Sequence, residues 1–374
     1  MTTKAKKKFN LANHSSLLSS LVSILCGLII AFVILMITNS RKGPSAFMCI
    51  LTGGFKLGGS KNLGTILFYA TPIICTGIAM CVAFQAGVFN IGGPGQYSVG
   101  GFAAIMTSLY ISKDLPAPLT WLLPVLAAII FGALWAAIPG ILKAYFNVNI
   151  VISTTMFNYI EMYYMMHWLS LWAYDATKGQ SKAVPAVAKL PSAFMPSLTS
   201  YKFSDIGIII AIIFAILAWV LMEKTQLGYE LKACGKNSNA SRYAGIREKR
   251  NIMVSILISG ALCGLGGGLM FLSQSGAYLK MTATTAAEGF TGIAVACLAN
   301  NSPLGAILGG LFLAFLTVGG SFMQVFGFQR EIVNVITSII IYFASFSLFI
   351  RQLIERFLNR KKKEINKITG EEIE

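Results

Sequence analysis

The stretch LGTILFYATPIICTGIAMCVAF, which occupies residues 63–84, contains no charged side chain and decides the class of this protein. Uninterrupted apolar runs of about 20 residues match the thickness of the hydrocarbon core of a bilayer. The whole chain has the same character, because hydrophobic residues make up 55% of its 374 residues and charged residues only 12%. Soluble domains carry about 25% charged residues. We therefore expect an integral membrane protein.

Similar apolar segments recur along the chain and predict an all-α, polytopic membrane protein with about ten transmembrane helices. The predicted spans are 17–38, 63–84, 88–111, 119–142, 150–173, 204–222, 252–273, 289–299, 304–326 and 332–350. Lysines precede the first span, as they do in a signal peptide. Its apolar core from Leu17 to Ile37 is too long for a signal peptide, however, so we expect an uncleaved span.

The distribution of positive charge predicts the orientation in the membrane. Lysine and arginine give the chain a net charge of +16, and they gather at residues 4–8, 224–250 and 351–367, beside apolar spans. The positive-inside rule places such stretches in the cytoplasm, and an even number of predicted spans separates them. Some lysines also occur in the predicted outer loops. This distribution indicates anionic membrane lipid, and excludes nucleic acid, as the partner of the basic residues.

The predicted organisation follows from these spans and charges, with both termini in the cytoplasm. We expect a basic cytoplasmic amino terminus at 1–16, a transmembrane domain at 17–350 with an external loop near 174–203 and a cytoplasmic loop near 223–251, and a charged cytoplasmic tail at 351–374.

Two of the predicted spans are broken or re-entrant, near 88–111 and 289–303. The sequence NIGGPGQ at 90–96 places three glycines and a proline at membrane depth, and NNSP at 300–303 ends a short apolar piece. Backbone groups freed in this way must be satisfied by protein or by a water-lined cavity. Paired interruptions point to a transport path. The tetrapeptide Thr-Gly-Ile-Ala, at both Thr76 and Thr291, suggests an internal repeat.

Close helix packing is the alternative role for such glycines. It is the expected role for Gly260, Gly264 and Gly268, which share one face of a predicted span.

The sequence contains no group that suggests catalysis. It has no G-x-x-x-x-G-K-[ST] motif, so any ATP must be bound by another chain. The seven cysteines form no C-x-x-C pair, and the two histidines, His14 and His167, are too far apart to suggest a metal site. We therefore expect a transport protein with no catalytic residues, no metal and no cofactor of its own.

Four motifs resemble those of one transporter family. The segments FNIGGPGQ (89–96) and GGFAA (100–104) resemble a signature of bacterial ABC-transporter permeases for ribose, branched-chain amino acids and nucleosides. The further segments are TTMFNYI (154–160), GKNSNASRYAGI (235–246), and GFTGIAV (289–295) with NSPLG (301–305). Together they are most similar to the larger permease of nucleoside importers that receive their substrate from basic-membrane-protein-type lipoproteins. The resemblance covers about residues 63–350.

The resemblance implies a permease in the bacterial inner, or cytoplasmic, membrane. Its implied partners are a second permease, a cytoplasmic ATPase that hydrolyses ATP, and a substrate-binding lipoprotein. It also implies that a short cytoplasmic helix docks on the ATPase. The candidate residues are Asn239, Ala240, Ser241, Arg242, Tyr243, Ala244 and Gly245.

The local sequence is compatible with such a helix. Ser238 or Asn239 could cap its amino end, and Gly245 could end it in a left-handed conformation. By composition alone, an ordinary basic loop facing lipid headgroups is the alternative.

The predicted span 150–173 carries polar residues at helical spacing. Thr154, Asn158, Glu161, Met165 and Trp168 share one face. A carboxylate at mid-span costs about 3 kcal/mol, so Glu161 should face a cavity or a partner group. The amide of Asn158 offers both a donor and an acceptor to a substrate. The candidate substrate-path residues are Asn90, Gln96, Asn158, Glu161, Asn300 and Asn301.

Several alternatives stay open at this stage. Glu161 could pair with another span and only hold the bundle together. Permeases of the family usually have a small apolar residue in its place, and this departure could mark a different substrate. Nucleoside is the expected substrate, and a monosaccharide or riboflavin is the alternative. An ion-coupled secondary transporter would need acidic residues within the membrane, for which Glu161 is the clear candidate. A non-transporting scaffold would tolerate bulky residues at Pro94.

Overall fold

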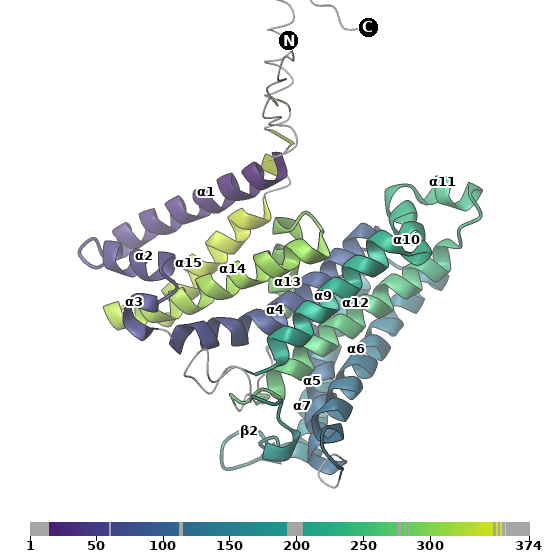
Figure 1. Ribbon diagram of the computed structural model, residues 1–374, viewed down its shortest axis with the longest axis horizontal. Helices are drawn as coiled ribbons and strands as arrows, with labels where there is room; N and C mark the ends of the chain where they lie inside the picture. The colour runs from purple at the N-terminus through teal and green to yellow at the C-terminus, as the bar shows by residue number, and fades with distance from the viewer. Residues whose placement is uncertain are drawn as a thin grey trace, which may run out of the picture.

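The computed structural model describes residues 15–59, 61–111, 115–192, 205–275, 278–280, 282, 284–346, 349–350, 352–353 and 356. The basic segment 4–8 and most of the tail 351–374 lie outside the described residues. Each of the ten predicted apolar segments contains a helix, so the all-α architecture is confirmed (Figure 1).

The helices and strands are as follows. The helices are α1 (Ser15–Thr38), α2 (Gly43–Leu51), α3 (Phe55–Gly58), α4 (Lys61–Gln85), α5 (Gly93–Tyr110), α6 (Leu119–Phe146), α7 (Ile150–Trp168), α9 (Gly207–Lys224), α10 (Gln226–Lys236), α11 (Ser238–Tyr243), α12 (Glu248–Phe271), α13 (Ala287–Leu298), α14 (Pro303–Ser321) and α15 (Arg330–Ser345). A π-helical turn covers Leu169–Ala173, 3-10 turns cover Ala186–Ala188 and Phe322–Phe326, and two short strands are β1 (Tyr174–Asp175) and β2 (Gln180–Ser181).

Five of the described helices are long and apolar enough to cross a bilayer. They are Asn62–Gln85, Leu119–Phe146, Gly207–Lys224, Glu248–Phe271 and, with its 3-10 extension, Pro303–Phe326. Helices α5, with 18 residues, and α13, with 12 residues, belong to the two predicted broken segments. The membrane class is therefore confirmed, and the number of ten crossings stays a prediction.

Helix α12 packs against α4, α5 and α6, and glycines make these contacts close. A Cβ atom built on Gly260, Gly264 or Gly268 would lie only 2.3, 2.3 or 2.6 Å from an atom of α6. On another side of the helix, a Cβ on Gly100 of α5 would lie 2.4 Å from the Cα of Gly264. The packing role that the sequence predicts for this glycine series is confirmed.

The cytoplasmic loop predicted at 223–251 is largely helical in the structure. It contains α10 and α11, and its last residues form the first turn of α12, which begins at Glu248 rather than near Ile252. The prediction failed at this boundary because hydropathy detects transfer into lipid, whereas a helix can continue beyond the apolar region with charged side chains in water. Helix α2 was also missed, although Ala46, Cys49 and Ile50 form a buried face at helical spacing.

A small hairpin lies at the opposite end of the molecule from α10 and α11 (Figure 1). Strands β1 and β2 pair antiparallel, and Gln180 forms a further bridge to Lys280, in the segment between α12 and α13. At the hairpin turn, the Thr177 hydroxyl donates to Asp175 and lowers the pKa of that carboxyl. The hairpin thus ties the α7–α9 connection to the α12–α13 connection.

Candidate functional site

Residues 86–92 join α4 to α5 without forming a helix: Ala86 and Gly87 form a turn, and residues 88–92 carry no regular secondary structure. A Cβ on Gly87 would lie 2.8 Å from the Cα of Gly235, at the end of α10. Farther along, the Asn90 side chain donates to the Ser259 hydroxyl at 2.9 Å, halfway along α12. Helix α5 begins only at Gly93. The predicted interruption near 88–111 is therefore confirmed as a non-helical segment followed by a helix.

Two buried amide side chains, Asn90 and Asn158, satisfy backbone groups of this segment and of the first turn of α5, and a third, Gln96, bonds to Asn90. Asn90 accepts from the amide N–H of Gly92 at 2.9 Å and donates to Gln96 Oε1 at 3.0 Å. Asn158 accepts from the N–H of Gly95 at 3.0 Å and donates to the carbonyl of Ile91 at 3.0 Å. A broken span needs such partners because its backbone groups have no helical ones.

These three amides are 0–2% exposed, so they lie inside the protein. The structure brings together four of the six predicted substrate-path residues: Asn90, Gln96, Asn158 and Glu161. Their side chains contact the protein itself.

Glu161 lies beside this network and is 3% exposed. The hydroxyl of Ser98, on α5, donates to its carboxylate. The face of α7 that the sequence predicts is buried at Thr154, Asn158, Glu161 and Met165. Within the described residues, Glu161 thus has Ser98 as a partner in the helix bundle. Ser98 also lies between Glu161 and a cavity that is described below.

The two broken segments meet where their helices, α13 and α5, begin. A Cβ on Gly289, in the first turn of α13, would lie 2.3 Å from the nitrogen of Pro94, in the first turn of α5. The Thr76 hydroxyl of α4 donates to the carbonyl of Glu288 at 3.0 Å. Two helix amino-terminal ends therefore face each other beside the middle of α4, and each carries a partial positive charge.

The remaining two predicted path residues lie elsewhere. Asn300 and Asn301 form a left-handed turn after α13, with φ angles of 49° and 60°. The Gln85 side chain, at the end of α4, donates to the carbonyl of Asn301. The side-chain oxygens of Asn300 and Asn301 are buried without a hydrogen-bond partner among the described residues. The six residues thus do not form one site, and their role in transport stays a prediction.

A cavity of about 820 Å3 opens near the end of the molecule that holds the hairpin and reaches the first turns of α5 and α13. Its described lining residues are Phe68, Tyr69, Tyr97, Ser98, Met270, Phe271, Ser275, Tyr278, Leu279, Lys280, Thr282, Thr284, Thr285, Ala286, Ala287, Glu288, Thr317, Ser321, Gln324, Val333, Asn334 and Thr337. We call it the outer cavity.

The outer cavity combines aromatic rings with hydroxyl and amide groups, and its described lining contains one acid and one base, Glu288 and Lys280. The rings of Tyr97 and Phe271 lie 6.2 Å apart, tilted by 53°. Mixed linings of this kind suit small molecules that have both an apolar face and polar edges.

The cavity residues were not singled out from the sequence. Tyr97 and Ser98 directly follow the NIGGPGQ segment, and Glu288 directly precedes the predicted short span. Their positions next to the two predicted interruptions could have identified them as candidate site residues.

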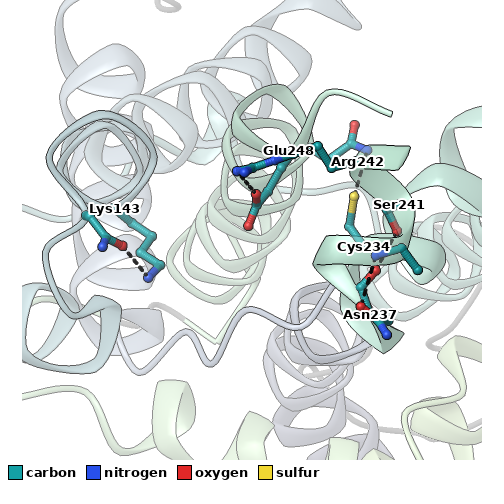
Figure 2. Close-up of polar contacts among 9 residues, drawn as sticks. Lys143, Cys234, Asn237, Ser241, Arg242 and Glu248 are labelled. Atoms are coloured by element: carbon teal, nitrogen blue, oxygen red, sulfur yellow. Dashed lines mark hydrogen bonds and ion pairs between the residues drawn. The ribbon is translucent and has the colours of Figure 1, made fainter. Parts of the chain in front are cut away.

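At the opposite end, α10 and α11 form a compact unit held to α12 (Figure 2). Arg242 pairs with Glu248 at 3.1 Å, and Arg250 pairs with Glu230 at 3.2 Å. Gly235, near the end of α10, packs so closely on the end of α4 that a Cβ would lie 2.2 Å from the carbonyl oxygen of Gln85. The unit therefore contacts both α12 and the start of the non-helical segment 86–92.

The candidate ATPase-docking segment 239–245 overlaps α11, with two corrections to its details. The helix begins at Ser238, and its cap is Asn237, whose side chain accepts from the amide of Ala240 at 3.0 Å. The predicted caps, Ser238 and Asn239, are therefore wrong, because the chain turns helical one residue earlier than expected. The left-handed ending at Gly245 is confirmed by its φ of 81°.

Comparison with known proteins identifies the class of protein that this fold and these motifs define. Residues 62–345 match the family described as the permease component of branched-chain amino acid transport systems, and the chain belongs to that family. It is a permease subunit of an ABC transporter, a multi-pass membrane protein and not an enzyme.

Individual relatives resemble the chain over most of its length. The guanosine ABC transporter permease protein NupP of Bacillus subtilis is 36% identical and covers 94% of this chain and 99% of its own. The nucleoside ABC transporter permease protein NupB of Lactococcus lactis is 36% identical and covers 84% of this chain and 87% of its own. The glucose ABC transporter permease protein TsgB13 of Haloferax volcanii is 33% identical, over 78% of each chain. None of the solved structures matches the chain at a significant level.

Proposed function

We propose that the chain is the larger permease of a nucleoside importer of the bacterial cell membrane. The observation that carries this proposal is the 36% identity to NupP, which extends over nearly the full length of both chains. The outer cavity supports it, because the exposed ring of Tyr278 offers an apolar face to a base while hydroxyls and amides offer partners to a ribose.

The proposed partners are a second, different permease, a cytoplasmic ATPase and a substrate-binding lipoprotein. The same bacterium that has NupP has a further guanosine permease, NupQ, which is 29% identical to this chain over 84% of its own length. Two distinct relatives in one organism support a pair of unlike permeases.

Helix α11 is the proposed contact with the ATPase. Its Tyr243 is 95% exposed, and exposed aromatic residues are frequent anchors of protein interfaces. The ion pairs of Arg242 and Arg250 hold the unit to α12, so a displacement of α11 is shared by a helix that packs on α5, the helical part of the first broken segment. In this orientation the outer cavity faces the side from which the lipoprotein delivers substrate, and both chain termini are cytoplasmic.

Uptake by the complete reconstituted complex tests the proposal. Proteoliposomes containing this chain and its cognate partner chains are supplied with radiolabelled guanosine, uridine, glucose or riboflavin, with and without internal ATP. We expect ATP-dependent nucleoside uptake. Uptake of glucose without nucleoside would instead establish the alternative that the 33% identity to TsgB13 supports. Uptake that persists in liposomes lacking the ATPase subunit would refute an ATP-driven mechanism.

A further inference from the structure

Glu288 supplies the one carboxylate among the described residues that line the outer cavity. It lies in the first turn of α13, where the partial positive charge of the helix end stabilises a carboxylate. Its backbone carbonyl accepts from Thr76, which fixes the position of the residue. Among the described residues, no ion pair and no side-chain hydrogen bond engages its two carboxylate oxygens. These oxygens are available to a molecule in the cavity.

Aromatic rings line the same cavity as this carboxylate. Tyr97 is 2% exposed and Phe271 is 8% exposed, so both rings are held in place by packing. Gly289 and Pro94 bring the first turns of α13 and α5 into backbone contact, and Tyr97 follows Pro94 by one turn of α5. A flat ring system that enters the cavity as far as this contact would meet Glu288 there.

The acceptor pattern of a carboxylate matches one type of base edge. An ionised carboxylate presents two acceptors and no donor. The hydrogen-bonding edge of guanine presents two adjacent N–H donors, from N1 and from the 2-amino group. The same edge of adenine presents one donor and one acceptor, whose lone pair faces a carboxylate oxygen. A carboxylate therefore accepts guanine in a two-bond arrangement and disfavours adenine.

We propose that Glu288 contacts the transported nucleoside and selects bases that present two adjacent N–H donors, as guanine does. This inference rests on the proposed nucleoside transport. It assigns base discrimination to the permease itself, at the point where its two broken segments meet.

The substitution Glu288→Gln tests the proposal, because glutamine keeps the size of the side chain and replaces one acceptor by a donor. Uptake of guanosine, inosine and adenosine is measured separately in the reconstituted complex, always with the same lipoprotein. The measured quantity is the guanosine-to-adenosine ratio of kcat/KM, relative to the same ratio for the unmodified complex. Preferences of the lipoprotein cancel in this comparison.

We expect the ratio to fall about tenfold, with kcat/KM for guanosine reduced and that for adenosine maintained or increased, because an amide matches the donor and acceptor of adenine. Inosine keeps the N1–H and lacks the amino group, so its loss should be intermediate. The matched control is Glu331→Gln, which neutralises an exposed carboxylate at the start of α15, outside the cavity lining. It should leave the ratio unchanged.

Each other outcome refutes the inference. An equal loss for all three nucleosides would mean that Glu288 binds the shared ribose or supports the fold, and an unchanged ratio would mean that it does not contact the base. Adenosine uptake in the variant reports whether the complex is folded. If the unmodified complex transports no nucleoside, the proposed function fails instead, which is a different result.

Discussion

Replacement of Gly264 by alanine should destabilise the protein through a single methyl group. Its Cβ would lie 2.3 Å from the carbonyl oxygen of Ala128 and 2.9 Å from the Cα of Gly132, both in the backbone of α6. Real Cβ contacts stay beyond 3.0 Å, so α12 and α6 must separate by about 0.7 Å. A backbone carbonyl cannot rotate away as a flexible side chain can. Gly100 of α5 packs on the same glycine, so α12 has little room to retreat.

The cost of such overpacking is about 1–3 kcal/mol, and the rigid neighbours on two sides favour the upper part of this range. Alanine regains up to about 1 kcal/mol of helix propensity, so we expect a net loss of about 2 kcal/mol. The assay is thermal unfolding of the purified protein in detergent, where the midpoint should fall on the order of 4 °C.

Gly309→Ala in α14 is the matched control, because its nearest contact would be an ordinary 3.4 Å to a side-chain methyl of Val295. Its midpoint should stay the same or rise. Equal midpoints for the two variants would refute the argument that the glycines of α12 are required for backbone contact.

Three further predictions concern the buried network and the α10–α11 unit. Asn158→Ala leaves the N–H of Gly95 and the carbonyl of Ile91 without partners, so stability should fall by about 3 kcal/mol, and unchanged thermal unfolding would contradict this. Asn237→Ala removes the cap of α11, which costs that helix about 1 kcal/mol; we expect slower uptake with unchanged nucleoside preference, and altered preference would be the contrary result. Glu248→Ala breaks the ion pair with the largely exposed Arg242, so the free energy of unfolding should fall by less than about 1 kcal/mol. A loss of stability as large as that of Asn158→Ala would contradict this and show that the pair is structural.

Much of the fold could be predicted because transfer into lipid constrains the sequence strongly. The apolar runs, the interruption at NIGGPGQ and the packing face of Gly260, Gly264 and Gly268 each express one local requirement, and each is found in the structure. Helix α2 and the early start of α12 depend on tertiary packing and on exposure to water, which hydropathy does not report.

The candidate site was harder to predict for a physical reason. Polar side chains within a membrane segment can serve a substrate, or they can satisfy backbone groups that a broken helix leaves free. Asn90 and Asn158 are residue types that suit substrate binding, but their side chains bond to backbone groups of the broken segment. Sequence shows only the residue type, whereas the partner depends on how α5, α7 and α12 come together.

The contact between Gly87 and Gly235 determines how stiff the connection is between α10 and the first broken segment. Side chains between two segments would act as a compliant layer, since rotamers can change before a backbone moves. Here backbone lies directly on backbone, because neither residue has a side chain. A displacement of α10 is therefore transmitted directly to the non-helical segment 86–92, and the hydrogen bond of Asn90 to Ser259 transmits it to the middle of α12.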